Sequence, residues 1–235
     1  MGGTGFIGSE IVKHFATRND DVISFSRNPP LKKNKVYKVN YINGDLNEKD
    51  KLYALTKDVD IIFHCGGSST PSSIDLDANE ELNTKNLVEA SFYNDVKKII
   101  FFSSGGAIYG NNENKFFKET DTPKPISKYG KTKLRTEKLL LDEFHNNKNR
   151  ILILRPSNPY GTPIENKKKQ GVIPIFLKLL SEDRTIKVFG DGSTIKDYIH
   201  ISDLIKIIHN LTLNSNYGIY NIGSGIQTSI NDLVS

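Results

Sequence analysis

The 235-residue sequence has one cysteine, one methionine and no tryptophan. A lone cysteine, Cys65, excludes a disulfide framework and any zinc site built from several cysteines, and it favours a reducing compartment. No apolar run approaches the ~20 residues that cross a bilayer, and we expect no secretion leader. These scarcities predict a soluble protein of the cytoplasm, without a membrane partner.

Basic residues outnumber acidic ones, and the formal net charge is +5. They form dense clusters only at Lys32, Lys33 and Lys35, and again at residues 167–169. Lysine runs of this kind are typical of solvated loops, and neither cluster has the interleaved aromatic residues of a single-strand binder. The charge pattern therefore predicts no nucleic-acid partner.

Short apolar segments alternate with segments of helical periodicity along the whole chain. The expected strands are residues 22–25, 36–41, 59–64, 98–102, 150–154 and 218–222. The expected helices are residues 9–17, 80–94, 128–147 and 202–213, with Ser127 placed to cap the third. This alternation predicts an α/β fold with a doubly wound parallel sheet covered on both faces.

Gly2, Gly5 and Gly8 lie directly before the first expected helix. Glycines let the backbone approach a pyrophosphate, and a helix N-terminus supplies N–H groups and a partial positive charge. Such a loop normally follows a buried central strand, but only Met1 precedes it here. We therefore expect a sequence truncated at its N-terminus, and also at its C-terminus, where an expected helix has barely begun by residue 235.

The first expected strand is followed by Ser26 and Arg27. In NAD sites the corresponding position usually holds Asp or Glu, which binds the ribose hydroxyls. A guanidinium beside that ribose suits the 2′-phosphate of NADP. The cofactor is predicted to be NAD or NADP. Arg27 favours NADP, and a solvent-exposed loop arginine is the alternative interpretation.

Tyr129 and Lys133 are four residues apart on an expected helix, which places both on one face. A free phenol, with a pKa near 10, is a poor base at neutral pH. A neighbouring ammonium favours the phenolate. After a glycine-rich loop and several strand–helix alternations, this pair is predicted to be catalytic, with Tyr129 as the proton acceptor.

Nine motifs occur in order along the chain, and together they resemble the extended short-chain dehydrogenase/reductases. The resemblance is to the branch of nucleotide-sugar epimerases and dehydratases, which includes the UDP-glucose 4-epimerases. The motifs are residues 2–8, 44–46, 63–67, 103–110, 129–133, 155–161, 189–192, 197–200 and 220–223. The resemblance implies a Rossmann-type domain over residues 1–161 and 190–222. It also implies a partial substrate-capping subdomain over residues 162–189 and 223–235.

The resemblance also implies the residues that bind cofactor and substrate. The cofactor-binding residues are Gly2, Gly5, Phe6, Ile7, Gly8, Arg27, Asp45, Leu46, Cys65, Gly66, Gly67, Ser103, Tyr129, Lys133 and Pro156. The substrate-binding residues are Ser69, Asn158 and Lys196. No metal is expected, because His14, His145 and His209 fall on expected helices with no Cys or carboxylate at ligand spacing.

Two departures from the family pattern bear on catalysis. The family's catalytic hydroxyl falls on Gly105 here, so Ser104 is predicted to substitute for it, whereas Ser103 is assigned to the cofactor side. Gly106 and Ala107 stand where 4,6-dehydratases carry an acid pair, which disfavours dehydration. Loss of a polarising hydroxyl should weaken proton transfer to Tyr129 rather than abolish it.

Lys196 marks a third departure, because the family usually has arginine there. A lysine gives a point-charge contact to phosphate instead of a bidentate one.

The predicted function is C4 epimerisation of a nucleoside-diphosphate sugar, by a homodimer joined through residues 80–94 and 128–147. A nucleotide-sugar reductase or dehydrogenase using NADPH, a non-catalytic NADP-binding protein and an inactive fragment remain open.

Overall fold

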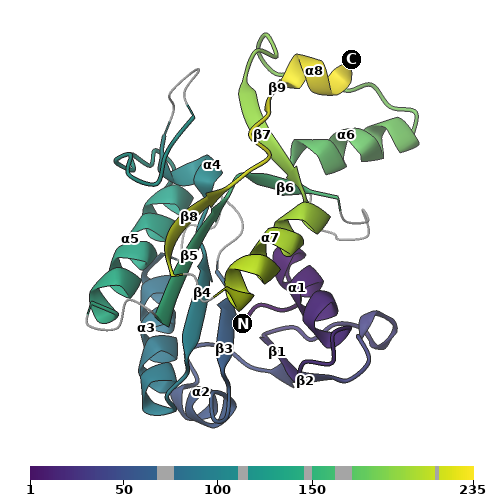
Figure 1. Cartoon of the computed structure of the whole chain (residues 1–235). Helices are drawn as coiled ribbons and strands as arrows, with labels where there is room; N and C mark the ends of the chain where they lie inside the picture. Colours follow the sequence, from purple (N-terminus) through teal and green to yellow (C-terminus); the bar gives the residue numbers. More distant parts are fainter. Residues whose placement is uncertain (68–76, 111–115, 146–149, 162–170, 215–216) are drawn as a thin grey trace.

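In the computed structural model, the described residues are 1–67, 77–110, 116–145, 150–161, 171–214 and 217–235. Four parallel strands form the central sheet (Figure 1). Their order is β3 (Ile61–His64), β4 (Lys98–Phe102), β5 (Ile151–Pro156) and β8 (Gly218–Ile222). Strands this apolar suit a sheet that is buried on both faces.

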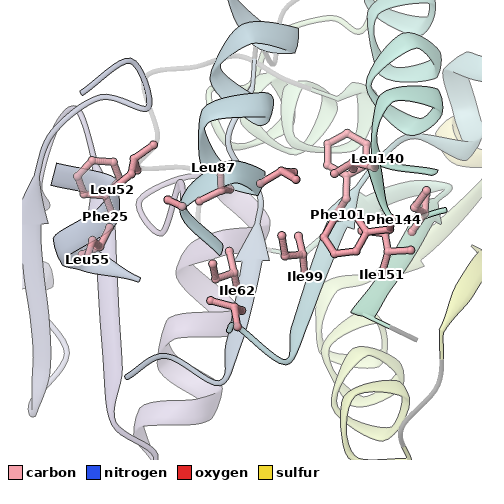
Figure 2. Close-up of a cluster of buried hydrophobic side chains, with 14 residues drawn as sticks. Phe25, Leu52, Leu55, Ile62, Leu87, Ile99, Phe101, Leu140, Phe144 and Ile151 are labelled. Atoms are coloured by element: carbon pink, nitrogen blue, oxygen red, sulfur yellow. The ribbon is translucent and has the colours of Figure 1, made fainter. Parts of the chain in front are cut away.

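Helices cover both faces of this sheet (Figure 1). On one face, α2 (Lys49–Leu55), α3 (Asp77–Tyr93) and α5 (Lys128–Glu143) pack on side chains such as Ile99 and Phe101. Figure 2 shows this cluster. On the other face, α1 (Phe6–Ala16) and α7 (Ile201–Leu213) pack on Ile100 and Leu152. The alternation along each strand therefore splits the core into two layers, and the predicted parallel α/β architecture is confirmed.

A second parallel sheet consists of β1 (Val22–Ser26) and β2 (Val39–Asn43). Met1 and Gly2 connect it to the central sheet. On the side of the central sheet, the amino group of Met1 donates to the Phe63 carbonyl (2.7 Å) and the Met1 carbonyl accepts from the Cys65 N–H (3.0 Å). On the side of β1, the Gly2 N–H donates to the Phe25 carbonyl (2.8 Å). These bonds lie where the sequence predicted a further central strand.

A smaller third sheet contains β6 (Asn158–Tyr160), β7 (Ile195–His200) and β9 (Gln227–Ser229). Strand β6 pairs parallel with β7, and β9 pairs antiparallel with β7. Helices α6 (Val172–Ser181) and α8 (Ile230–Val234) belong to this region, above the carboxyl ends of the central strands in Figure 1. We call these five elements the outer region.

Several predicted boundaries were wrong. Helix α1 begins at residue 6, not 9, and α5 ends at residue 143, not 147; the strand expected at 36–41 lies at 39–43. The 3-10 turn η1 (Lys32–Asn34) and helix α4 (Gly105–Ile108) were not anticipated. The predicted cap was confirmed, since Ser127 accepts from the Gly130 N–H at 3.0 Å. None of the helices within the described ranges has the length and apolarity needed to span a membrane.

Candidate functional site

The glycine-rich loop forms a backbone cradle in front of α1. Gly2 has φ +75°, and a Cβ there would lie 2.8 Å from the Gly66 nitrogen. A Cβ on Gly8 would collide with the Gly2 carbonyl oxygen. The N-cap of α1, Gly5, brings no side chain over the helix start. The cradle therefore fits the pyrophosphate of a dinucleotide, held by the N–H groups of the first helical turn.

The loops after β1 and β2 come together near this cradle. Arg27 Nε lies 3.7 Å from Asp45 Oδ2, and both side chains are partly exposed. The Leu46 carbonyl accepts from Asn86 Nδ2 at 3.2 Å, which ties the loop to α3. The structure therefore brings together Arg27 and Asp45, two predicted cofactor-binding residues, and their charges partly offset each other.

Cys65 and Gly66 follow β3 and line the other side of the cradle. Burial of the Cys65 thiol raises its pKa to about 12, so the thiol stays protonated at neutral pH. Gly66 lies against Gly2, as the close approach at that residue shows. This side of the cradle therefore offers backbone and a neutral thiol to a bound ligand.

Tyr129 is carried to the site by the close approach of α5 to α4. Gly130 faces the Ala107 carbonyl, and a Cβ at Gly130 would overlap that oxygen. Tyr129, half-buried, directly precedes Gly130 in the first turn of α5. A larger residue at position 130 would push this helix start, and Tyr129 with it, away from α4.

Lys133 is buried one turn further along α5. Its Nζ lies 5.8 Å from the centre of the Tyr129 ring, 5.0 Å from that of Phe101, and 2.9 Å from Glu80 Oε1. Burial acts to lower the pKa of Lys133, but the charge of Glu80, the phenol of Tyr129 and the hydrogen bond to Glu80 raise it above its usual value. The ammonium form is therefore maintained, and Glu80 is a site residue that the sequence did not reveal.

Two serine hydroxyls at the end of β4 remain available. Ser103 Oγ is buried and has no hydrogen-bond partner among the described residues. Ser104 is the N-cap of α4, but its side chain makes no cap hydrogen bond. A Cβ on Gly105 would lie 2.8 Å from the Arg155 carbonyl oxygen. The backbone therefore comes too close to β5 at residue 105 for a side chain there, and Ser104 stays a prediction as its substitute.

A buried polar network fixes α4 and α5 relative to β5. The Arg155 guanidinium donates to both Glu137 carboxylate oxygens, at 3.0 and 2.6 Å, and to the Tyr109 hydroxyl at 2.6 Å. Tyr109 in turn donates to Asn221 Oδ1 at 2.7 Å. A bidentate arginine–carboxylate pair is geometrically specific. This network therefore fixes the helix that carries Tyr129 and Lys133.

The predicted substrate residues Asn158 and Lys196 line one cleft of about 250 Å³ in the outer region. Asn158 also lies against α4, because a Cβ on Gly106 would be 3.4 Å from its Oδ1. Thr194 and Tyr198 share the cleft, and neither was predicted from the sequence as a site residue. Thr194 directly precedes β7 and Tyr198 lies two residues after Lys196 in that strand, and this proximity to Lys196 was the signal that could have found them. Ser69 lies outside the described residues.

His64 and His200 have structural partners. His64 is buried with Nε2 3.1 Å from Thr84 Oγ1, and burial together with the charge of Lys133 lowers its pKa to about 3. His200 accepts from the Ser202 N–H at 3.3 Å and caps α7. In the part of the chain that the structure describes, no three His, Cys, Asp or Glu side chains gather as a metal site.

Comparisons with known proteins identify the family. The profile of the NAD dependent epimerase/dehydratase family matches residues 1–223. The chain belongs to this family. Relative to a "Putative UDP-glucose 4-epimerase" of Methanocaldococcus jannaschii, it is 34% identical over 245 residues, which cover 99% of this chain and 78% of the relative.

Solved structures of epimerases share the same fold. The UDP-glucose 4-epimerase of Thermotoga maritima with UDP-glucose is 28% identical, with a TM-score of 0.87 over 99% of this chain and 78% of that one. The Thermus thermophilus UDP-glucose 4-epimerase in complex with NAD is 28% identical, with a TM-score of 0.88 over 99% and 79%. This epimerase/dehydratase chain therefore has the fold of enzymes that have been seen with NAD and with a nucleotide sugar.

Proposed function

We propose that this chain is an NAD(P)-dependent epimerase that inverts C4 of a nucleoside-diphosphate hexose. The observation that carries the proposal is the position of Tyr129 and Lys133. Lys133 lies under Gly67, which follows the cradle residue Gly66, and α5 contacts α4, which in turn contacts Asn158 in the cleft. A contiguous path therefore connects the dinucleotide cradle, the acid–base pair and the cleft.

The chain's own residues would divide the chemistry as follows. A nicotinamide cofactor bound at the cradle would supply reversible hydride transfer at C4 of the sugar. Tyr129, as phenolate, takes the proton of the 4-hydroxyl and gives it back, with the Lys133 ammonium stabilising its charge. The 4-keto sugar turns over between the two transfers. Ser104 polarises the reacting oxygen.

The cleft would hold the nucleotide part of the substrate. Lys196 supplies a cation for a diphosphate, and Asn158 supplies an amide beside α4. Tyr198 and Tyr160 give the cleft aromatic walls. The relatives that are named as UDP-glucose 4-epimerases support uridine diphosphate as the nucleotide.

Turnover assays separate this function from its rivals. Purified protein is incubated with UDP-galactose, and separately with UDP-glucose plus NADPH, and the products are followed by chromatography. Redox-neutral conversion of UDP-galactose to UDP-glucose supports the epimerase, whereas net NADPH consumption indicates a reductase. Tyr129→Phe should lower kcat by about 10²–10⁴-fold with cofactor affinity within roughly tenfold. A variant that keeps more than about a tenth of the parent rate would contradict the role of Tyr129.

We further infer that the cofactor is NADP, because Arg27 follows Ser26 where NAD sites usually have a carboxylate. Asp45 faces Arg27 at 3.7 Å and reduces its net charge, so the preference should be moderate. Arg27→Ala should weaken NADP binding by about 1–3 kcal/mol and leave NAD binding unchanged in calorimetry. Equal affinities for the two cofactors in the parent protein would contradict this inference.

We also infer a cytoplasmic homodimer joined through α3 and α5. Exposed apolar side chains on these helices include Leu82 at 55% and Leu141 at 37% exposure. Light scattering after size-exclusion chromatography should give a dimer for the parent and a monomer for Leu141→Glu. A monomeric parent protein would show that this surface has another role.

A further inference from the structure

One buried contact between α3 and α5 is an ion pair, beside the apolar packing of Leu87 and Leu140. Lys133 Nζ and Glu80 Oε1 are 2.9 Å apart, and the two side chains are only 6% and 5% exposed. Taking two charges out of water is costly, and such a pair is not needed merely to hold two helices together. Because the pair lies beside Tyr129, it points to a role in the chemistry of that residue rather than in helix packing.

The loop after β3 closes over this pair. Gly67 has φ +147°, a conformation that side chains rarely adopt, and a Cβ there would lie 2.8 Å from Lys133 Nζ and 2.9 Å from Glu80 Oε1. The Phe101 ring lies 5.0 Å from Nζ on the sheet side. The ammonium is therefore confined by a carboxylate, an aromatic face and a backbone segment, and little freedom remains for it to move.

Four groups face Lys133 from the elements around it: Glu80 on α3, Tyr129 on α5, and His64 and Cys65 at the end of β3. The pKa of His64 is lowered to about 3 and that of Cys65 is raised to about 12, so both are neutral near pH 7. Among these four, Glu80 supplies the compensating negative charge.

We propose that Glu80 is a positioning residue for the Tyr129–Lys133 pair. Its carboxylate holds the Lys133 ammonium charged and fixed beside the phenol. The inference rests on the proposed function, because it assigns Lys133 its role in proton transfer. Without the carboxylate, burial would remain as the main influence on Lys133, and the ammonium would lose its proton more readily. Its position between Phe101 and Tyr129 would also loosen.

The direct test measures the titration of Lys133 by NMR of side-chain-labelled lysine, with no cofactor or substrate present. The Lys133 signal is assigned by its loss in Lys133→Met. In the parent, Lys133 should titrate above the usual lysine value. In Glu80→Gln its midpoint should fall by about 1–3 pH units, to below that value.

Glu81→Gln is the matched control. Glu81 is the next residue on α3, and its carboxylate pairs with Arg135 on α5 in a partly exposed position. The control therefore removes an α3–α5 ion pair of the same type without touching Lys133. The Lys133 signal should titrate in Glu81→Gln as it does in the parent.

Turnover supplies the second readout. In Glu80→Gln the alkaline limb of the kcat profile should move to lower pH with the Lys133 midpoint, and KM should stay within about twofold. If Glu80→Gln does not fold, Glu80→Asp decides. It keeps the charge one methylene further from Nζ, so the midpoint should fall by a smaller amount in the same direction.

A Lys133 midpoint that equals the parent's in a folded Glu80 variant would overturn the inference, whatever the turnover. A parent protein that turns over no nucleotide sugar would instead overturn the proposed function, while the NMR titration would still report on Glu80. A shift of equal size in Glu81→Gln would also overturn the inference about Glu80, because the effect would then be one of helix packing.

Discussion

The central sheet and the outer region are built on different principles. All residues of β5 are buried, and α5 buries Thr136, Glu137 and Leu140 on the sheet side. In the outer region neither α6 nor α8 has a buried residue, and Leu180 on α6 is 61% exposed. The first region is held by apolar burial, whereas the helices of the second bury no side chain and its strand β7 contributes Ile199 to the core.

Hydrogen bonds to one carboxylate connect several segments of the outer region. Asp197 on β7 accepts from Ser157 Oγ (3.0 Å), from the Ser224 N–H and Oγ (2.9 and 3.0 Å) and from the Gly225 N–H (2.9 Å). Such bonds specify geometry, and a hydrogen bond to a charged group contributes about 1.5–3 kcal/mol. The region held by apolar burial therefore carries the acid–base pair, whereas the cleft lies in the region whose helices are not buried.

The largest expected effect is a matched pair of truncations, Leu152→Ala in β5 and Leu180→Ala in α6. Leu152 is fully buried, so its truncation should lower the free energy of unfolding by about 2–5 kcal/mol. Leu180→Ala should change it by less than about 0.5 kcal/mol. Urea unfolding of both variants measures the difference. Similar losses of stability at the two positions would contradict the difference in apolar burial between the central sheet and the outer region.

The second prediction concerns acid stability. The folded protein keeps His64 neutral with a pKa of about 3, whereas an unfolded histidine binds a proton near pH 6.5. Stability should therefore be lost as the pH falls from about 6.5 towards 3, by about 3 kcal/mol between pH 7 and 4. His64→Asn should remove this part of the pH dependence in urea unfolding at several pH values.

The exposed His145→Asn serves as the control for that experiment. It should leave the pH dependence of unfolding as it is in the parent. If His64→Asn loses stability with falling pH as steeply as the parent does, acid sensitivity of the central sheet has another source.

The smallest expected effect compares two helix caps. Ser127 caps α5 by accepting from Gly130, and Ser229 caps α8 in a reciprocal box with Asp232. Ser127→Ala should cost about 1 kcal/mol in global unfolding, the usual value of a cap. Ser229→Ala should instead speed hydrogen exchange in α8 with no change in the global transition. Equal global losses would mean that the outer region unfolds together with the sheet.

The sequence predicted the central sheet well because β3, β4 and β5 each contain a continuous apolar run. The bounds of β4 and β8 were predicted to the residue, since charged or turn residues flank them. The start of α1 was misplaced by three residues, because Gly5 is an N-cap without a side-chain signal. Helix α6 was not among the expected helices, and Pro174 interrupts its pattern.

The candidate site was predictable only where a motif carries it. Tyr129, Lys133 and Asn158 belong to motifs, and the structure connects them through α4. Glu80 could not be found in this way, because it is one of several acidic residues at a polar helix start and lies 53 residues from its partner. Contacts of that separation depend on how α3 and α5 pack, which the local pattern does not encode.

The order in which strands join the sheet has a consequence for chain entropy. Strand β5 pairs with β8, Leu152 opposite Gly218, and the elements β6, α6, β7 and α7 lie in the loop that this pairing closes. Each doubling of such a loop costs only about 0.6 kcal/mol in closure entropy. The elements that shape the cleft can therefore be lengthened or replaced at small cost, while β5 and β8 keep their pairing.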